Sequence, residues 1–124
     1  MNYSTEKKDN YIILKIKEKK LDSTRAPDLK TELVKFNANG EKYIILDMSE
    51  VKYVDSSGLS CILVGNRLCT GASGKLVLSQ VNTHVDKLLE ISQLKGVLEV
   101  VPNIDEAVQF IRLSELESEL NSGE

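Results

Sequence analysis

Apolar residues along the chain fall into alternating short and long runs, which predict strands and helices in turn. Three short runs, at 11–17, 42–48 and 75–81, have the length and the apolar and β-branched content of strands. The run at 42–48, KYIILDM, is apolar almost throughout, which is typical of a strand buried on both faces of a sheet. We therefore expect it to be the centre of the sheet. Two further short strands are predicted near Tyr3 and at 97–102.

Four longer segments carry apolar residues at helical spacing and separate the predicted strands. They lie within 21–40, 58–74, 84–96 and 103–113. Their starts carry side chains that can cap a helix: Ser23 or Thr24, Ser56 or Ser57, Thr83 with Asp86, and Asn103 with Glu106. Strands that alternate with helices in this way predict a small α/β domain with helices packed on a sheet.

The length of the chain, 124 residues, fits one domain with a single hydrophobic core. We assign this domain to residues 1–113. Residues 114–124 keep leucines at 116 and 120 in an acidic background, so this segment either extends the last helix or frays as an acidic tail. We expect the last few residues to be disordered.

Composition narrows the classes of partner and site. The formal net charge is −3, which argues against a strongly basic surface for nucleic acid. No stretch approaches the roughly 18 apolar residues of a membrane span, and the first ten residues lack a signal-peptide core, so we expect a cytoplasmic protein without membrane insertion. Cys61 and Cys69 lie about two turns apart on one predicted helix, and His84 is the single histidine. We expect buried thiols, a solvent-facing His84, no metal site and no cofactor.

The segment YVDSSGLS, residues 53–60, places Asp55, Ser56 and Ser57 where a strand-like run gives way to a helix. One explanation is a helix cap, in which a serine oxygen accepts a backbone N–H and Asp55 complements the helix dipole. A cap needs only one hydroxyl, however. The other explanation is that a hydroxyl accepts a phosphate. A phosphoserine at a helix start carries about −1.5 to −2 charges at pH 7 and can sit over free backbone N–H groups without unfolding the domain.

Catalysis and nucleotide binding fit the same segment less well. A nucleophile of the G-x-S-x-G type needs a glycine two residues before the serine, which D-S-S-G lacks, and no orienting partner for His84 as a base is recognisable. A phosphate-binding loop needs G-x-x-x-x-G-K-[ST], and Asp55 would repel an incoming anion. A small α/β enzyme that uses Asp55 and Ser56 directly is therefore a remote alternative.

Residues 44–68, IILDMSEVKYVDSSGLSCILVGNRL, resemble the signature of STAS-domain proteins of the anti-sigma-factor antagonist type. The similarity extends over most of the chain. Residues 21–33 resemble the family's first helix with its preceding aspartate, and residues 75–108 follow the family's order of strand, helix, strand and helix. The resemblance implies a single STAS domain, a small mixed sheet of about four to five strands with helices packed largely on one side.

The resemblance also implies a function, that of a non-enzymatic regulator that works by partner switching. In this family the first hydroxyl residue after the motif aspartate is the phosphorylation site, which here is Ser56. The unphosphorylated protein would bind an anti-sigma factor that is also a serine kinase of the histidine-kinase-like ATPase type, and so free a sigma factor. Phosphorylation of Ser56 would break this complex, and a PP2C-type phosphatase would reset the protein.

The candidate partner-binding residues come partly from the resemblance and partly from helical geometry. Asp22 and Asp55 occupy positions that the family associates with the partner surface, and Ser57 and Gly58 shape the start of the helix. Leu59, Ile62 and Leu63 are expected to face the sheet, while Ser60, Val64 and Arg67 share another face of the helix. Ordinary surface residues would show the same spacing. Ser60 is also a second candidate phosphate acceptor, ranked below Ser56.

The chain departs from the family pattern just before the first predicted helix. Many relatives have a G-E-[LI]-D turn there, whereas EKKLD at 18–22 keeps Asp22 and lacks the glycine, so we expect a differently shaped connection. The family also offers a second function. STAS domains serve as scaffolds or regulatory modules in stress-sensing assemblies and as cytoplasmic parts of transport systems, and that alternative stays open on the sequence.

Overall fold

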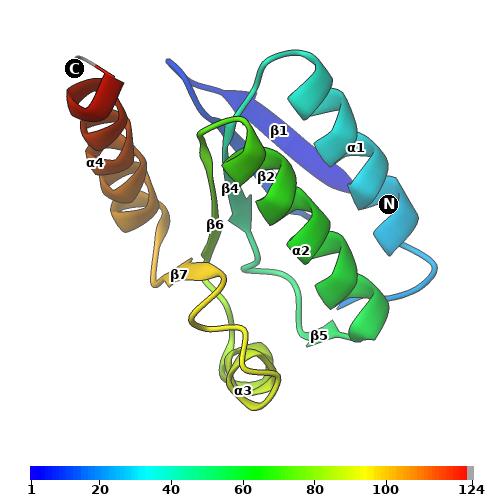
Figure 1. Ribbon diagram of the computed structural model, residues 1–124. Helices are drawn as coiled ribbons and strands as arrows, with labels where there is room; N and C mark the ends of the chain where they lie inside the picture. The colour runs from blue at the N-terminus through cyan, green and yellow to red at the C-terminus, as the bar shows by residue number, and fades with distance from the viewer. Residues whose placement is uncertain (123–124) are drawn as a thin grey trace.

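The computed structural model describes residues 1–122, and at its centre is a five-stranded mixed sheet (Figure 1). In spatial order the strands are β1 (Tyr3–Lys7), β2 (Ile12–Ile16), β4 (Tyr43–Asp47), β6 (Lys75–Ser79) and β7 (Glu99–Val101). The β1–β2 pair is antiparallel and the other three pairs are parallel. Every residue of β4 is buried, which confirms the prediction that its apolar run forms the centre of the sheet.

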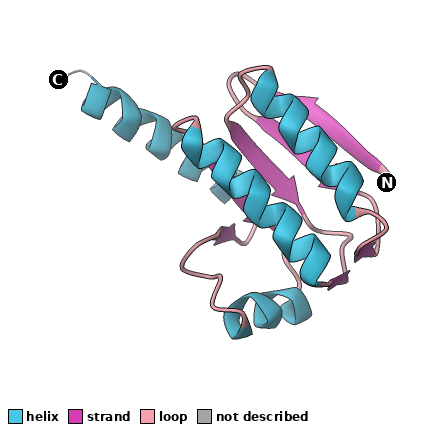
Figure 2. Ribbon diagram, turned by 45° about the vertical axis from the view of Figure 1, so that its right-hand side comes forward, coloured by secondary structure: helices cyan, strands magenta, loops and turns pink. Residues whose placement is uncertain are grey.

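Helices cover both faces of this sheet, unequally. They are α1 (Ala26–Ala38), α2 (Ser56–Gly71), α3 (Thr83–Ile91) and α4 (Ile104–Ser122). Figures 1 and 2 show α1 and α2 side by side on one face, α3 beyond one end of the sheet, and α4 on the opposite face. Buried residues of α1, α2 and α3 belong to one hydrophobic cluster. The predicted packing of helices largely on one side is therefore confirmed.

A smaller cluster holds α4 against the other face of the sheet. Ala107 and Ile111 are fully buried there and pack with Tyr43, Ile45 and Val77. Full burial of such apolar side chains stabilises the fold by about 1.5–3 kcal/mol for each large one. Ala107 and Ile111 are thus inward-facing positions of this helix.

Beyond residue 113, α4 continues as a helix to Ser122. The segment from 114 to 122 therefore extends the last helix, one of the two outcomes that the sequence allowed. Leu113, Leu116 and Leu120 on this part of the helix are exposed. Disorder was expected for the last few residues, of which residues 123 and 124 lie outside the described part of the chain.

Three of the four predicted helix caps are wrong, and two of these are at α1 and α3. For α1 the capping position is Arg25, whose side chain makes no capping hydrogen bond, instead of Ser23 or Thr24. For α3 the cap is Asn82, whose Oδ1 accepts the N–H of Val85 at 2.8 Å. The amide of Asn82 also donates to the carbonyls of Val51 and Lys52, in the connection that follows β4, at 3.2 and 3.3 Å. These tertiary bonds orient its oxygen toward the helix, an effect that the local sequence does not contain.

The cap predicted for α4 is confirmed, because Asn103 Oδ1 accepts the N–H of Glu106 at 2.9 Å. No helix within residues 1–122 has both the length and the apolar content to span a membrane.

A second, two-stranded sheet lies beside the main one and was not predicted. Its strands are β3 (Lys20–Leu21) and β5 (Tyr53–Val54), which pair in parallel with Leu21 opposite Val54. Strands of two residues carry no measurable periodicity, so the sequence could not indicate them. This pairing is what positions the candidate site, because α1 follows shortly after β3 and α2 follows directly after β5.

Candidate functional site

The β3–β5 pair brings together two aspartates that are far apart in the sequence. Asp22 follows Leu21 and Asp55 follows Val54, and the backbone N–H of Asp55 donates to the carbonyl of Leu21 at 3.3 Å. Neighbouring parallel strands run about 4.8 Å apart. The two candidate carboxylates therefore leave the same end of the small sheet, at the start of α2.

Asp55, and not a serine, caps α2. Its backbone is extended, with φ −99° and ψ −174°, and its Oδ1 accepts the N–H of Gly58 at 3.0 Å. The prediction of Ser56 or Ser57 as the cap is wrong, because the helix already begins at Ser56. Within residues 1–122 neither serine hydroxyl makes a hydrogen bond. Ser56 is exposed and Ser57 is half-buried, so the Ser56 hydroxyl is open to solvent.

Replacing the capping carboxylate is expected to weaken the fold only moderately. Asp55→Ala removes the bond to Gly58 and should lower the free energy of unfolding by about 1 kcal/mol, whereas Asp55→Asn keeps a capping oxygen and should cost far less. Urea unfolding followed by circular dichroism measures both. Equal stability of the two variants would contradict the assignment of Asp55 as the cap.

Gly58 allows the start of α2 to approach the β3–α1 connection closely. A Cβ at this position would lie 2.4 Å from the carbonyl oxygen of Leu21 and 2.8 Å from Cγ1 of Val54. Gly65 lies about two turns further along α2. It is similarly close to α1, since a Cβ at this position would lie 2.7 Å from Cδ1 of Leu33. Both glycines thus bring α2 against elements that carry the other half of the site.

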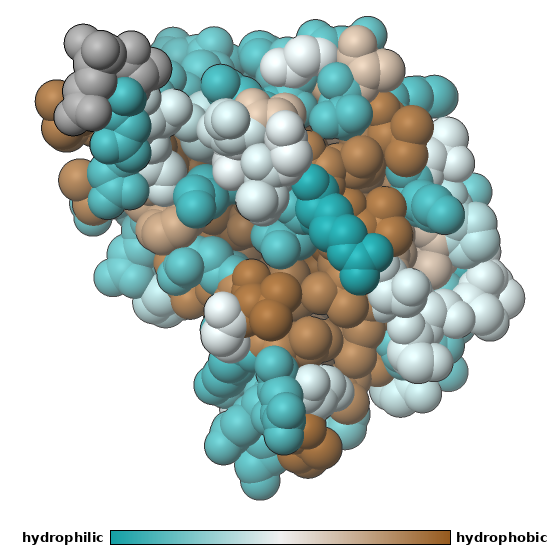
Figure 3. All heavy atoms as spheres, viewed as in Figure 1, coloured by the Kyte–Doolittle hydropathy of each residue, from teal (hydrophilic) through white to brown (hydrophobic). Residues whose placement is uncertain are grey.

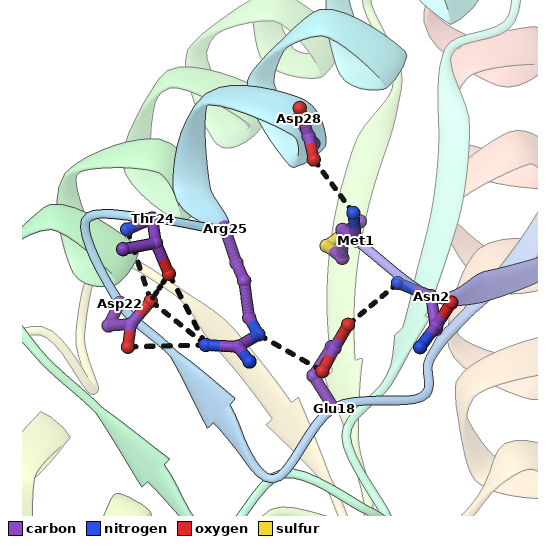
Figure 4. A network of polar contacts seen from close by, with 7 residues as sticks. All are labelled: Met1, Asn2, Glu18, Asp22, Thr24, Arg25 and Asp28. Atoms are coloured by element: carbon purple, nitrogen blue, oxygen red, sulfur yellow. Dashed lines mark hydrogen bonds and ion pairs between the residues drawn. The ribbon is translucent and has the colours of Figure 1, made fainter.

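The Asp22 carboxylate accepts hydrogen bonds within the turn that leads into α1 (Figure 4). This carboxylate accepts Oγ1 of Thr24 at 2.7 Å and the N–H of Thr24 at 3.1 Å, and Arg25 Nη1 lies 3.4 Å from both oxygens. The hydrogen bond from the Thr24 hydroxyl is the main cause that lowers the pKa of Asp22. Arg25 also pairs with Glu18, with Nε 3.0 Å from Oε1. The turn therefore presents an ionised Asp22 in a defined position.

An open groove of about 460 Å³ lies between the first turns of α1 and α2. Its lining residues are Ser23, Ala26, Pro27, Lys30, Ser56, Ser57, Ser60, Cys61 and Val64. Figure 3, in the view of Figure 1, shows apolar side chains reaching the surface on this helical face. The groove brings together four of the candidate positions, namely both motif serines, the exposed Ser60 and the half-buried Val64.

Both cysteines lie below this surface, as predicted. Burial raises the pKa of the Cys61 thiol to about 11, and burial raises that of Cys69 to about 12. The two thiols are therefore protonated at neutral pH and act as small apolar side chains in the core.

Comparison with known proteins identifies the family of this chain. Residues 2–107 match the family model described as the STAS domain. The chain belongs to the STAS domain family. The fold class and the resemblance seen in the sequence are thereby confirmed.

Relatives of this STAS domain with similar sequences carry the name anti-sigma factor antagonist. BtrV of Bordetella bronchiseptica is 32% identical over 82 residues, which span 66% of this chain and 68% of BtrV. An anti-sigma F factor antagonist of Paenibacillus polymyxa is 33% identical over 76 residues, 61% of each chain. The match to the second relative thus spans less than two thirds of that protein.

A solved structure supports the same architecture. The crystal structure of an anti-sigma factor antagonist from Thermotoga maritima superposes with a TM-score of 0.82, covering 89% of this chain and 94% of that one. The two sequences are 24% identical, so this likeness concerns the fold alone.

Five of the residues singled out in the sequence do not line the groove of the STAS domain: Asp22, Asp55 and Gly58 at the small sheet, and Arg67 and His84 elsewhere. Arg67 is exposed further along α2 and does not line the groove. His84 faces solvent, as expected, and its ring stacks on Tyr53 with a centroid distance of 6.4 Å. Lys30, by contrast, lines the groove and was missed, because nothing in the sequence of α1 shows that it lies opposite the motif.

Proposed function

We propose that this STAS domain is an anti-sigma-factor antagonist that works by partner switching, with its state set at Ser56. The unmodified protein binds an anti-sigma factor that is also an ATP-dependent serine kinase of the histidine-kinase-like type, and a sigma factor is released. Phosphorylation of Ser56 dissociates the complex. A PP2C-type phosphatase removes the phosphate and restores binding.

The accessible hydroxyl of Ser56 is the observation that carries this proposal. Ser56 is exposed at the first residue of α2, and Asp55 takes the capping bond that would otherwise occupy a serine. Transfer of the γ-phosphoryl group from ATP forms a bond from Ser56 Oγ to phosphorus, breaks the bond to ADP and releases the hydroxyl proton. The product dianion lies at a helix N-terminus, where the helix dipole favours negative charge, so the fold can persist while its surface changes.

The proposed partner surface is built around the same helix start. Asp22 and Asp55 supply its charges, and the buried Gly58 contributes by allowing close approach of the two segments. Ser57, Ser60 and Val64 contribute the groove. Arg67 extends the surface along α2, outside the groove.

We propose further that the protein is a substrate of a kinase and not itself an enzyme. A hydrolytic role would need a base within hydrogen-bond reach of the nucleophile. His84 lies against Tyr53, and no hydrogen bond joins it to Ser56 or Ser57 within the described residues.

A comparative pull-down from the native cytosol tests the proposal. Purified Ser56→Ala and Ser56→Asp proteins, both checked for folding, serve as baits, and Ser92→Asp on the exposed end of α3 is the charge control. We expect the Ser56→Ala and Ser92→Asp proteins to capture a kinase-like anti-sigma factor and Ser56→Asp to lose it. The carboxylate at position 56 adds like-charge repulsion and a desolvation cost to a close interface. Capture of the same partners by all three would contradict the switch and favour a scaffold or transport-associated module.

A further inference from the structure

Lys30 on α1 lines the same groove as the proposed phosphate acceptor, Ser56. It is the one ionisable side chain with a charge at neutral pH among the groove's lining residues, which otherwise include four serines. Within residues 1–122 Lys30 forms no ion pair, whereas the other basic residue of this helix, Lys35, lies 3.7 Å from Glu32. The ammonium of Lys30 is therefore available to an anion that enters the groove.

The position of Lys30 on α1 places it across the groove from the start of α2. Lys30 lies in the second turn of α1, and side chains on a helix lean toward its N-terminus, here toward the first turn that borders the groove. The charge of Lys30 acts on the Cys61 thiol, which also lines the groove. Although burial raises the pKa of the Cys61 thiol, Lys30 acts on the same thiol in the opposite direction, lowering its pKa. Cys61 and Ser56 line the same groove as Lys30.

We propose that Lys30 binds the phosphate of phosphorylated Ser56 across the groove and so joins α1 to α2 in the modified state. This inference rests on the proposed function, which makes Ser56 the phosphate acceptor. An ammonium and a phosphate dianion form a charge-assisted hydrogen bond, which is stronger than a bond between neutral groups. The hydroxyls of Ser23 and Ser60 lie in the same lining as further donors. Phosphorylation then does more than repel a partner, because the phosphate and Lys30 occupy the groove.

The second ionisation of the phosphate reports this contact directly. Ionised Lys30 favours the dianion and lowers the pKa, which is about 6 for a free phosphoserine. Phosphoserine is introduced at position 56 during synthesis of the full chain, and the pKa is measured by phosphorus NMR titration at low ionic strength. We expect Lys30→Met to raise this pKa by about 0.5 unit or more, and Lys30→Arg to restore it. Lys35→Met is the matched control and should leave it unchanged.

Two outcomes would overturn the inference. One is an unchanged phosphate pKa in Lys30→Met. The other is an equal pKa shift in Lys30→Met and Lys35→Met, which would indicate a long-range effect of positive charge and no contact between Lys30 and the phosphate. Both lysines are exposed, so loss of the fold is not expected, and circular dichroism checks it. Because the phosphate is installed without a kinase or partner, this titration is independent of the pull-down. Its failure would remove the role of Lys30 alone, and failure of the pull-down would remove the switch alone.

Discussion

Phosphorylation of Ser56 is expected to weaken binding of the anti-sigma factor about a thousandfold, whereas Ser56→Ala should change the affinity by less than about tenfold. A thousandfold loss corresponds to about 4 kcal/mol of binding free energy. The dianion adds like charge beside Asp22 and Asp55, which leave neighbouring strands, and it must also be desolvated in a close interface. Loss of one hydroxyl hydrogen bond costs only about 1 kcal/mol. Charge, and not the missing hydroxyl, is thus expected to operate the switch.

Calorimetric titration of the partner recovered by pull-down measures this difference. The protein with phosphoserine at 56 is compared with Ser56→Ala and with a protein that carries phosphoserine at Ser92 instead. The loss should shrink as salt is raised, since repulsion between partly exposed charges is screened over about 10 Å at 0.1 M. Affinities within tenfold for the first two proteins, or an equal loss with phosphate at Ser92, would contradict the prediction.

Gly58→Ala is expected to lower the free energy of unfolding by about 3 kcal/mol. The new methyl group would lie 2.4 Å from the Leu21 carbonyl oxygen, which is backbone and cannot rotate away, and 2.8 Å from Val54. Relief requires that α2 move away from the small sheet, and that movement breaks packing among buried residues. The same movement would separate Asp55 from the turn that carries Asp22.

Gly71→Ala is the control for this substitution. Gly71 is the last residue of the same helix, and a Cβ there meets no atom within 4 Å. Alanine has the higher helix propensity, so this variant should be neutral or more stable by up to about 1 kcal/mol. Urea unfolding of both variants gives the comparison. Similar stability of Gly58→Ala and Gly71→Ala would mean that the close approach at Gly58 carries little energy.

The candidate site depends on contacts between two separate segments, the start of α2 and the β3–α1 connection with α1. The motif supplies a capped helix start with a free hydroxyl. The β3–α1 connection supplies Asp22, and this connection together with α1 supplies the opposite wall of the groove. Gly58 and Gly65 allow the halves to approach closely, because a side chain at either position would collide with Leu21 or Leu33. A partner that binds this surface would therefore contact two segments whose relative position depends on α2 packing.

The order of the four helices and of the five strands of the main sheet, the central strand and the family could all be predicted from the sequence. These features are local, since hydrophobic periodicity and a motif such as D-S-S-G are contained within a few adjacent residues. The sequence also determined that Ser56 lies at the start of a helix. It did not determine what caps that helix, because Asp55, Ser56 and Ser57 are all capping residue types.

The choice among these capping residues and the assembly of the site both depend on tertiary contacts. The β3–β5 pair holds Asp55 in extended backbone just before the helix, so that its carboxylate takes the cap and leaves the serine hydroxyls free. The same pair places Asp22 beside Asp55, and α1 packed against α2 places Lys30 in the groove of Ser56. Each of these contacts joins segments that are distant in the chain. A local pattern contains no information on which distant segments meet, because packing against a common core sets that choice.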